Sequence, residues 1–310
     1  MQMHEIIIAL APVFLMILLG WFTRCFLFSE TIKWRLIEKV TYYLFVPALV
    51  IKHLLYVDLE NVQITNALLA LLATIFAVSL ILLLSRKKIN QHFSISDQSF
   101  TSIFQGSIRA NFFISLAAAP VLLGNNLAAL LVLLIAIFTI TVNFISVLVL
   151  AQFGGEGKRN LNHVALQLLG NPFILSTFVG VAINLSGLEL PEYINRGVGF
   201  LSSLGLPLAL FCAGASIFVI NFRNQFNSIL LASAIRLIIS PLIAYLIGKV
   251  LGLDGQIIAT LVLFHGQPTA VTSYILAREM EGDHELMASI LTSQTALSVV
   301  SLPIMLLLLA

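Results

Sequence analysis

Ten long runs of apolar residues account for almost the whole of this chain, and they constrain its fold more than any other feature. Each run is bounded by charged residues or by Gly, Pro or Asn, and each can supply the roughly 20 helical residues that cross a bilayer. Their approximate limits are 4–23, 36–56, 62–85, 98–122, 127–151, 162–186, 194–220, 227–250, 255–278 and 285–309. Charged residues make up only 10% of the chain, against about 25% in soluble domains. We therefore expect an all-α integral membrane protein with ten transmembrane helices.

The distribution of Lys and Arg over the short connections predicts how the chain is oriented. Cytoplasmic connections of membrane proteins carry an excess of these residues. Here they are concentrated after the odd-numbered spans, whereas the connections after the even-numbered spans carry acidic residues and almost no Lys or Arg. We expect a multi-pass protein of the inner (plasma) membrane with both termini extracytoplasmic. The formal net charge of +2 is too small to indicate a nucleic-acid partner.

Helix-perturbing residues recur at a constant offset of 160 residues. The matching pairs are Pro12 and Pro172, Gly20 and Gly180, Pro47 and Pro207, Phe104 and Phe264, and Gly106 and Gly266. Because five spans is an odd number, a second copy of five enters the membrane from the opposite side. This inverted-topology repeat is typical of secondary transporters. The sequence thus predicts one repeat at 1–160 and another at 161–310, the alternative being chance agreement between two apolar sequences.

Spans 4 and 9 occupy equivalent places in the two repeats and are the least hydrophobic. Span 9 contains Gly266 and Pro268, which loosen and interrupt a helix, and span 4 contains a polar run at 105–111 but no proline. Both places lie about 11 residues, or roughly 16 Å, from the helix entry, near the middle of the bilayer. We expect both helices to break there, with half-helix N-termini near Asn111 and Thr269. Free N–H groups and positive dipole ends at those places favour an anion.

Two arginines lie deep in predicted spans, where an arginine costs about 2.5–3.5 kcal/mol on insertion scales. Arg109, in span 4, needs a partner because a guanidinium does not deprotonate in proteins, yet no acidic residue falls near the middle of any span. Either a substrate carboxylate supplies the missing charge, or Arg109 binds carbonyl groups at the break. For Arg236, which precedes Pro241 in span 8, we favour a structural role, binding carbonyl groups that broken helices leave free.

Other polar residues inside the spans allow two interpretations each. His265 is either a proton carrier or a neutral hydrogen-bonding residue. Asn143 and Gln294 either face the substrate site or bond a neighbouring helix. The lack of acidic residues near the middle of the spans argues against a carboxylate-based site for coupling to Na⁺ or H⁺.

The sequence offers little support for functions other than transport. It contains no HExxH or GxSxG motif, so we expect no enzyme. Its histidines and cysteines show no metal-ligand spacing, and we expect no metal or cofactor. Cys25 and Cys212 both lie in apolar stretches, and we interpret them as packed free thiols. A ligand sensor built on a transporter fold is a weaker alternative, because no signalling region is recognisable.

Several short motifs, in order along the chain, carry a resemblance to a known family. They are Tyr43 to Leu49 in span 2, Arg109-Ala110-Asn111 in span 4, Asn171-Pro172 at the start of span 6, Gln267-Pro268-Thr269 and Ala277-Arg278-Glu279 in span 9, and Ser301-Leu302-Pro303 in span 10. Through them the whole chain resembles the auxin efflux carrier family and its bacterial members. Family members often have proline between the residues that match Arg109 and Asn111, where this chain has Ala110.

The resemblance implies a fold like those of sodium/proton antiporters and bile-acid symporters. Spans 1, 2, 6 and 7 would form a scaffold domain, and spans 3–5 and 8–10 a transport domain in which broken helices 4 and 9 cross. It also implies a homodimer and elevator-type alternating access.

The resemblance further implies where substrate binds. Asn111 and the Pro268-Thr269 turn would line the site beside Arg109, with His265 and Gln267 from the same polar run and Asn143 and Gln294 as candidate neighbours. Val46, Pro47 and Leu210 would be contacts from the scaffold. The expected substrate is a small organic anion, such as malate, malonate or an auxin-like weak acid, moved across the lipid bilayer. The alternative is a sodium-coupled organic-anion symporter of the bile-acid symporter type.

Overall fold

The protein is helical throughout the part that the computed structural model describes, which comprises residues 2–28, 31–55, 63–154, 170–217 and 225–309. Three short π-helical segments, η1 to η3, interrupt the α-helices. The elements are α1 (Met3–Phe22), η1 (Thr23–Leu27), α2 (Thr31–Val40), η2 (Thr41–Phe45), α3 (Val46–Leu54), α4 (Ile64–Phe93), α5 (Asp97–Ile108), α6 (Phe112–Leu123), α7 (Asn125–Phe153), α9 (Pro172–Ser186), α10 (Glu192–Ala215), α11 (Phe226–Ala234), η3 (Ile235–Ile239), α12 (Ser240–Val250), α13 (Gly255–His265), α14 (Val271–Glu279) and α15 (His284–Leu309).

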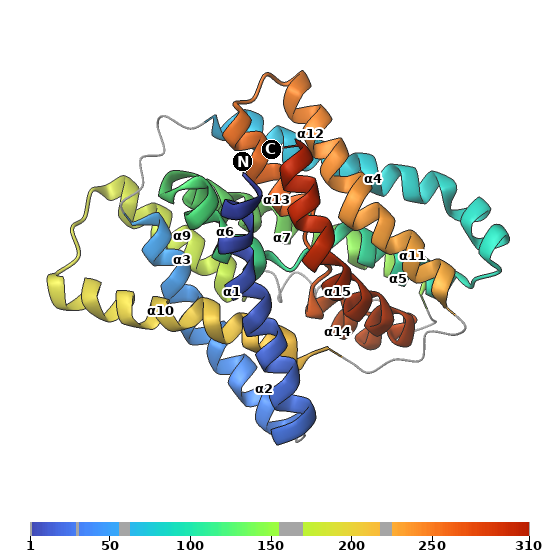
Figure 1. The fold of residues 1–310 in the computed structure, drawn as a ribbon, viewed down its shortest axis with the longest axis horizontal. Coiled ribbons are helices and arrows are strands. Elements are labelled where there is room, and N and C mark those ends of the chain that lie inside the picture. The colour runs from blue at the N-terminus through green and yellow to red at the C-terminus, as the bar shows by residue number, and fades with distance from the viewer. Residues whose placement is uncertain (1, 29–30, 56–62, 155–169, 218–224, 310) are drawn as a thin grey trace.

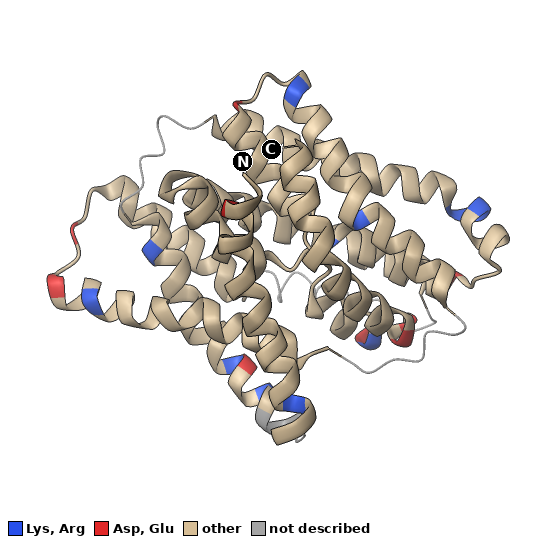
Figure 2. Cartoon of the chain, viewed as in Figure 1, with Lys and Arg blue, Asp and Glu red and all other residues tan. Residues whose placement is uncertain are grey.

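Seven helical segments of the described chain are long and apolar enough to cross a membrane. They coincide with predicted spans 1, 3, 4, 5, 7, 8 and 10. Predicted span 2 corresponds to the end of α2 with η2 and α3, and span 9 to α13 and α14. Span 6 begins outside the described residues and continues as α9. Most charged residues lie toward helix ends, and a few Lys and Arg lie within helices, separated by long uncharged stretches (Figure 2).

The helix of predicted span 3 is longer than the sequence indicates. It continues past residue 85 as far as Phe93. Arg86, Lys87 and Lys88 are too polar for the bilayer core, but Lys and Arg are good helix formers, so the helix continues through them. Ser94, in the left-handed conformation with φ of 52°, ends it. The prediction that the connection to span 4 begins at Arg86 is therefore wrong.

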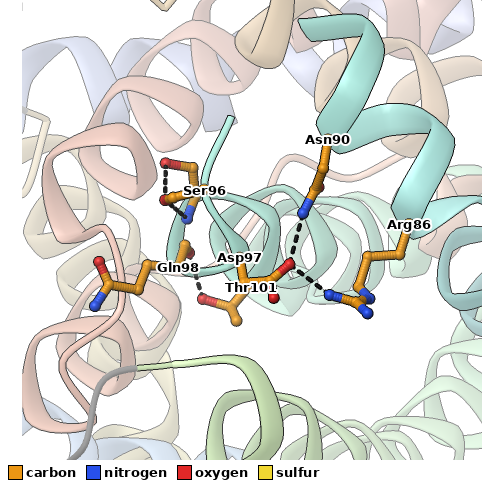
Figure 3. Close-up of polar contacts among 7 residues, drawn as sticks. Arg86, Asn90, Ser96, Asp97, Gln98 and Thr101 are labelled. Atoms are coloured by element: carbon orange, nitrogen blue, oxygen red, sulfur yellow. Dashed lines mark hydrogen bonds and ion pairs between the residues drawn. The ribbon is translucent and has the colours of Figure 1, made fainter. Parts of the chain in front are cut away.

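The short connection between α4 and α5 is held by polar side chains (Figure 3). Asp97, the first residue of α5, accepts hydrogen bonds at Oδ1 from Arg86 Nη1 (2.5 Å) and from Asn90 Nδ2 (2.6 Å). Ser96 caps α5 by accepting from the backbone N–H of Ser99 at 3.0 Å. These bonds fix how α5 enters the protein.

The helices form two groups that pack mainly within themselves (Figure 1). The first group contains α1, α3, α9 and α10 together with α2 and η2, and the second contains α4, α5, α7 and α11 to α15. α6 contacts both groups. α1 and α10 approach each other very closely. A Cβ added at Gly20 would overlap the Phe211 carbonyl, and a Cβ added at Gly214 would overlap the Ile17 carbonyl. Small residues allow helix backbones to approach in this way.

The two cysteines differ in their surroundings. Cys212, in α10, is buried, whereas Cys25, in η1, is exposed. The expectation of a packed thiol is confirmed for Cys212 and wrong for Cys25.

Replacement of Gly214 by alanine should destabilise the protein, because the new methyl group overlaps the Ile17 backbone and α1 must move away. We expect a loss of about 1–3 kcal/mol, typical of overpacking, measured as a lower unfolding temperature in detergent. Gly197→Ala is the matched control in the same helix, since open space surrounds that position. Equal unfolding temperatures for the two variants would contradict the close approach.

Candidate functional site

Two broken helices meet inside the second group of helices. α5 ends at Ile108 and α6 begins at Phe112, while α13 ends at His265 and α14 begins at Val271. The backbone N–H of Asn111 donates to the carbonyl of Pro268 at 2.8 Å, which joins the two breaks directly. Both predicted breaks are therefore present. The first forms without a proline, since Arg109 adopts an extended conformation with φ of −80° and ψ of 149°.

Arg236 satisfies the carbonyl groups that the breaks leave free. Its Nε donates to Gln267 O (2.7 Å), Nη1 to Ile108 O (3.3 Å) and Nη2 to Phe264 O (3.2 Å). The side chain, in η3, is 1% exposed. One guanidinium thus closes the C-terminal ends of both α5 and α13, where the helix dipoles are negative. The predicted structural role of Arg236 is confirmed.

Gln294 holds both breaks from a third helix, α15. Its Oε1 accepts from the backbone N–H of Thr269 at 2.8 Å, and its Nε2 donates to the carbonyl of Gly106 at 3.0 Å. Of the two interpretations of Gln294, bonding to neighbouring helices is what the structure shows.

Arg109 lies at the first break with part of its hydrogen-bonding capacity unused. The residue is 7% exposed, and its Nη2 donates to Thr272 Oγ1 at 3.0 Å. Its Nη1 is buried and has no partner among the described residues, and no ion pair of the described chain includes Arg109. Because Thr272 lies in the first turn of α14, this guanidinium adds its charge to the positive end of a helix dipole.

The starts of α6 and α14 supply further hydrogen-bond donors. A helix leaves its first N–H groups without partners inside the helix. Asn111 is the N-cap of α6, and its side chain makes no capping bond. α14 begins at Val271, two residues after the predicted Thr269, because Ala270 is extended with φ of −86° and ψ of 151°. The backbone N–H of Thr269 is already bound by Gln294. The free donors of α14 are therefore expected at Val271 and Thr272.

Three other side chains predicted to contact substrate are His265, Gln267 and Asn143. His265 Nδ1 pairs with Ser240 Oγ at 3.1 Å, whereas its Nε2 is buried without a partner. Gln267 Nε2 donates to Leu263 O at 2.6 Å, and its Oε1 has no partner in the described chain. Asn143 is half-buried in α7. Their contact with substrate stays a prediction.

The three predicted scaffold contacts lie in the first group of helices. Val46 and Pro47 begin α3, and Leu210 lies in α10, which packs against α3. Val46 and Leu210 are both buried. Their role as substrate contacts likewise stays a prediction.

The sequence reasoning missed residues that reach Arg109, or the break at which it lies, from other elements. Thr272, its hydrogen-bond partner, stood unremarked among several small polar residues of span 9. Tyr42, in η2, bonds to Asn171 at the start of α9, whose Phe173 packs on Phe112 beside the first break. Only its neighbour Tyr43 belonged to a recognised motif. Nothing in a single sequence links residues so far apart along the chain.

The arrangement can bind an anion. The Arg109 guanidinium and the starts of α6 and α14 lie at the joined breaks, and no ion pair of the described residues includes Arg109. In the described part of the chain, His, Cys, Asp and Glu side chains nowhere gather in threes that could hold a metal ion.

Comparison with known proteins agrees with a membrane transporter. The sequence profile of the family described as "Membrane transport protein" matches residues 5–306. A protein of Methanothermobacter thermautotrophicus (strain Delta H) named "Uncharacterized transporter" is 34% identical over 152 residues, 49% of this chain and 48% of that protein. A Rhizobium meliloti (strain 1021) protein named "Putative malonate transporter" is 26% identical over 311 residues, which cover 96% of this chain and 93% of that one.

Replacement of Arg236 by lysine should destabilise the protein although the charge is kept. A single ammonium group cannot reach the three carbonyl groups that the guanidinium binds, and each charge-assisted bond contributes about 1.5–3 kcal/mol. We expect a markedly lower unfolding temperature in detergent. Arg196→Lys is the matched control, because the Arg196 side chain is 80% exposed. Wild-type stability of Arg236→Lys would show that the breaks do not depend on this residue.

Proposed function

This chain belongs to the membrane transport protein family and is a membrane transporter, and we propose that its cargo is a small organic anion. The proposed cargo is a carboxylate, such as malonate, malate or an auxin-like weak acid. The observation that carries the proposal is the buried guanidinium of Arg109, which has a free Nη1 and no acidic partner in the described chain.

The electrostatics of the crossing support an anion over a neutral or cationic cargo. Arg236 compensates the negative C-terminal ends of α5 and α13. Within the described chain no charged side chain comparably compensates the positive N-terminal ends of α6 and α14, and Arg109 increases the positive potential at α14. A buried charge without a partner is costly. A bound carboxylate would supply both the missing charge and acceptors for the free N–H groups.

The two groups of helices suggest how such a cargo would cross the membrane. We propose that the group of α1, α3, α9 and α10 is a scaffold, and that the other group carries the site past it by elevator-type alternating access. The ten-span layout of two inverted five-helix repeats, a homodimer formed through the scaffold, and an inner-membrane orientation with extracytoplasmic termini belong to the same proposal. The packing of the helices into two groups supports it.

Coupling to an ion is a separate question. No acidic residue lies near the middle of a span in this sequence, so a carboxylate-based sodium site is missing from the crossing. His265 is buried and follows Phe264, whose carbonyl binds the fixed cation Arg236, so a proton on His265 would add a second buried positive charge beside the first. We propose facilitated movement of the anion, with sodium coupling of the bile-acid symporter type as the alternative.

Arg109→Gln should abolish carboxylate binding while the protein still folds. The amide is neutral and shorter, so the anion loses its counter-charge, and we expect affinity to fall by at least tenfold. The measurement is isothermal titration calorimetry of the purified protein in detergent, with malonate, malate and indole-3-acetate, each with and without sodium. The neutral amides of the same acids are the ligand controls.

The control variant is Arg196→Gln, which removes an exposed arginine from α10. It should bind carboxylates like the wild type. Equal affinity in Arg109→Gln would remove Arg109 from the site, and binding of the amides as tightly as of the acids would refute an anion carrier. Binding that appears only with sodium would favour the symporter alternative.

A further inference from the structure

Tyr42 carries a hydrogen-bond acceptor that no contact of the described chain uses. Its hydroxyl oxygen lies 3.1 Å from Asn171 Oδ1. The same Oδ1 accepts from the backbone N–H groups of Phe173 (2.9 Å) and Ile174 (3.4 Å), which caps α9. Because these N–H groups need an acceptor, the capping atom is the amide oxygen, and Tyr42 donates its only proton to it. The phenol oxygen keeps its lone pairs and has no proton left to give.

The pair of Tyr42 and Asn171 lies beside the first break. The ring of Phe173 packs on that of Phe112 with centroids 5.0 Å apart, and Phe112 begins α6 immediately after the break. Since η2 and α9 belong to the first group of helices, residues of both groups lie beside the first break.

Tyr42 is more exposed than the unpartnered acceptors near the breaks. Gln105 and Gln267 each carry an unpartnered Oε1, but both residues are 0% exposed. Tyr42 is half-buried. A ligand at Arg109 would therefore meet the guanidinium and the helix N-termini as donors, and Tyr42 as an acceptor.

We propose that Tyr42 is a specificity-determining residue of the anion site, selecting carboxylates that also carry a hydroxyl or N–H donor. The inference rests on the proposed anion site and names the class of substrate that it takes. A carboxylate binds Arg109 and the free N–H groups, and the donor of the same molecule binds the phenol oxygen. An acid without a donor leaves the phenol oxygen without a hydrogen-bond donor. A second carboxylate placed there is repelled by the lone pairs of that oxygen.

The test compares matched acids that differ by one hydroxyl group. The pairs are tartronate with malonate and malate with succinate, titrated calorimetrically into the wild type and into Tyr42→Phe in detergent. We expect the wild type to bind the hydroxy acid of at least one pair about threefold to tenfold more tightly, as one neutral hydrogen bond allows. In Tyr42→Phe the ratio should fall to about one through weaker binding of the hydroxy acid alone.

Tyr43→Phe is the matched control, because this neighbouring tyrosine is 64% exposed; it should keep the wild-type ratio. Asn171→Ala is a second variant, which frees the Tyr42 proton so that the phenol can donate. It should shift the preference toward the acids without a hydroxyl group.

The inference is overturned if the wild type favours neither hydroxy acid, or if its preference survives unchanged in Tyr42→Phe. It is also overturned if Tyr42→Phe weakens both members of a pair equally. These outcomes leave the proposed function intact as long as the wild type binds acids through Arg109. If the wild type binds none of the four acids, the proposed function falls together with this inference.

Discussion

The structure depends on how backbone groups are satisfied where a helix stops inside a bilayer. Hydrocarbon offers no water to exposed N–H and C=O groups, so broken helices at that depth survive only when protein or a wet cavity supplies partners. Here two breaks are placed together, and Asn111 of one donates to Pro268 of the other. Arg236 then binds carbonyl groups from both broken helices, and Gln294 binds the Gly106 carbonyl of one and the Thr269 N–H of the other. The crossing is therefore one bonded unit rather than two separate defects.

The helix ends at the two breaks differ in how well their backbone groups are bonded. The C-terminal ends of α5 and α13 have the Arg236 guanidinium as a charged partner. Among the described residues no acidic side chain forms an ion pair with Arg109 beside the N-terminal ends of α6 and α14, and Arg109 makes that region more positive. A binding site for an anion requires hydrogen-bond donors and positive charge that protein groups do not already use. The helix N-termini and Arg109 provide both, so an anion there completes the bonding instead of competing with protein groups.

Much of this arrangement could be predicted from the sequence, since it follows from local chemistry. Pro268 marks the second break, the polar run of span 4 marks the first, and a deep arginine before a proline indicates a carbonyl-binding role for Arg236. What escaped prediction depends on tertiary contacts. Gln294 binds the backbone N–H of Thr269, α14 begins only after the extended Ala270, and α4 continues to Phe93. Tyr42 comes beside the first break only through Asn171 and Phe173 at the start of α9.

The same contacts determine what can move. Arg236 in η3 and Gln294 in α15 tie both broken helices to their own helices, so the second group of helices resists any motion that would separate the two breaks. The contacts across to the first group are of a weaker kind, such as the ring packing of Phe112 on Phe173. Alternating access by sliding of the two groups would break these contacts and leave the crossing intact. A ligand held by Arg109 and Tyr42 together would then lie at the sliding surface, where its presence or absence alters the free energy of movement.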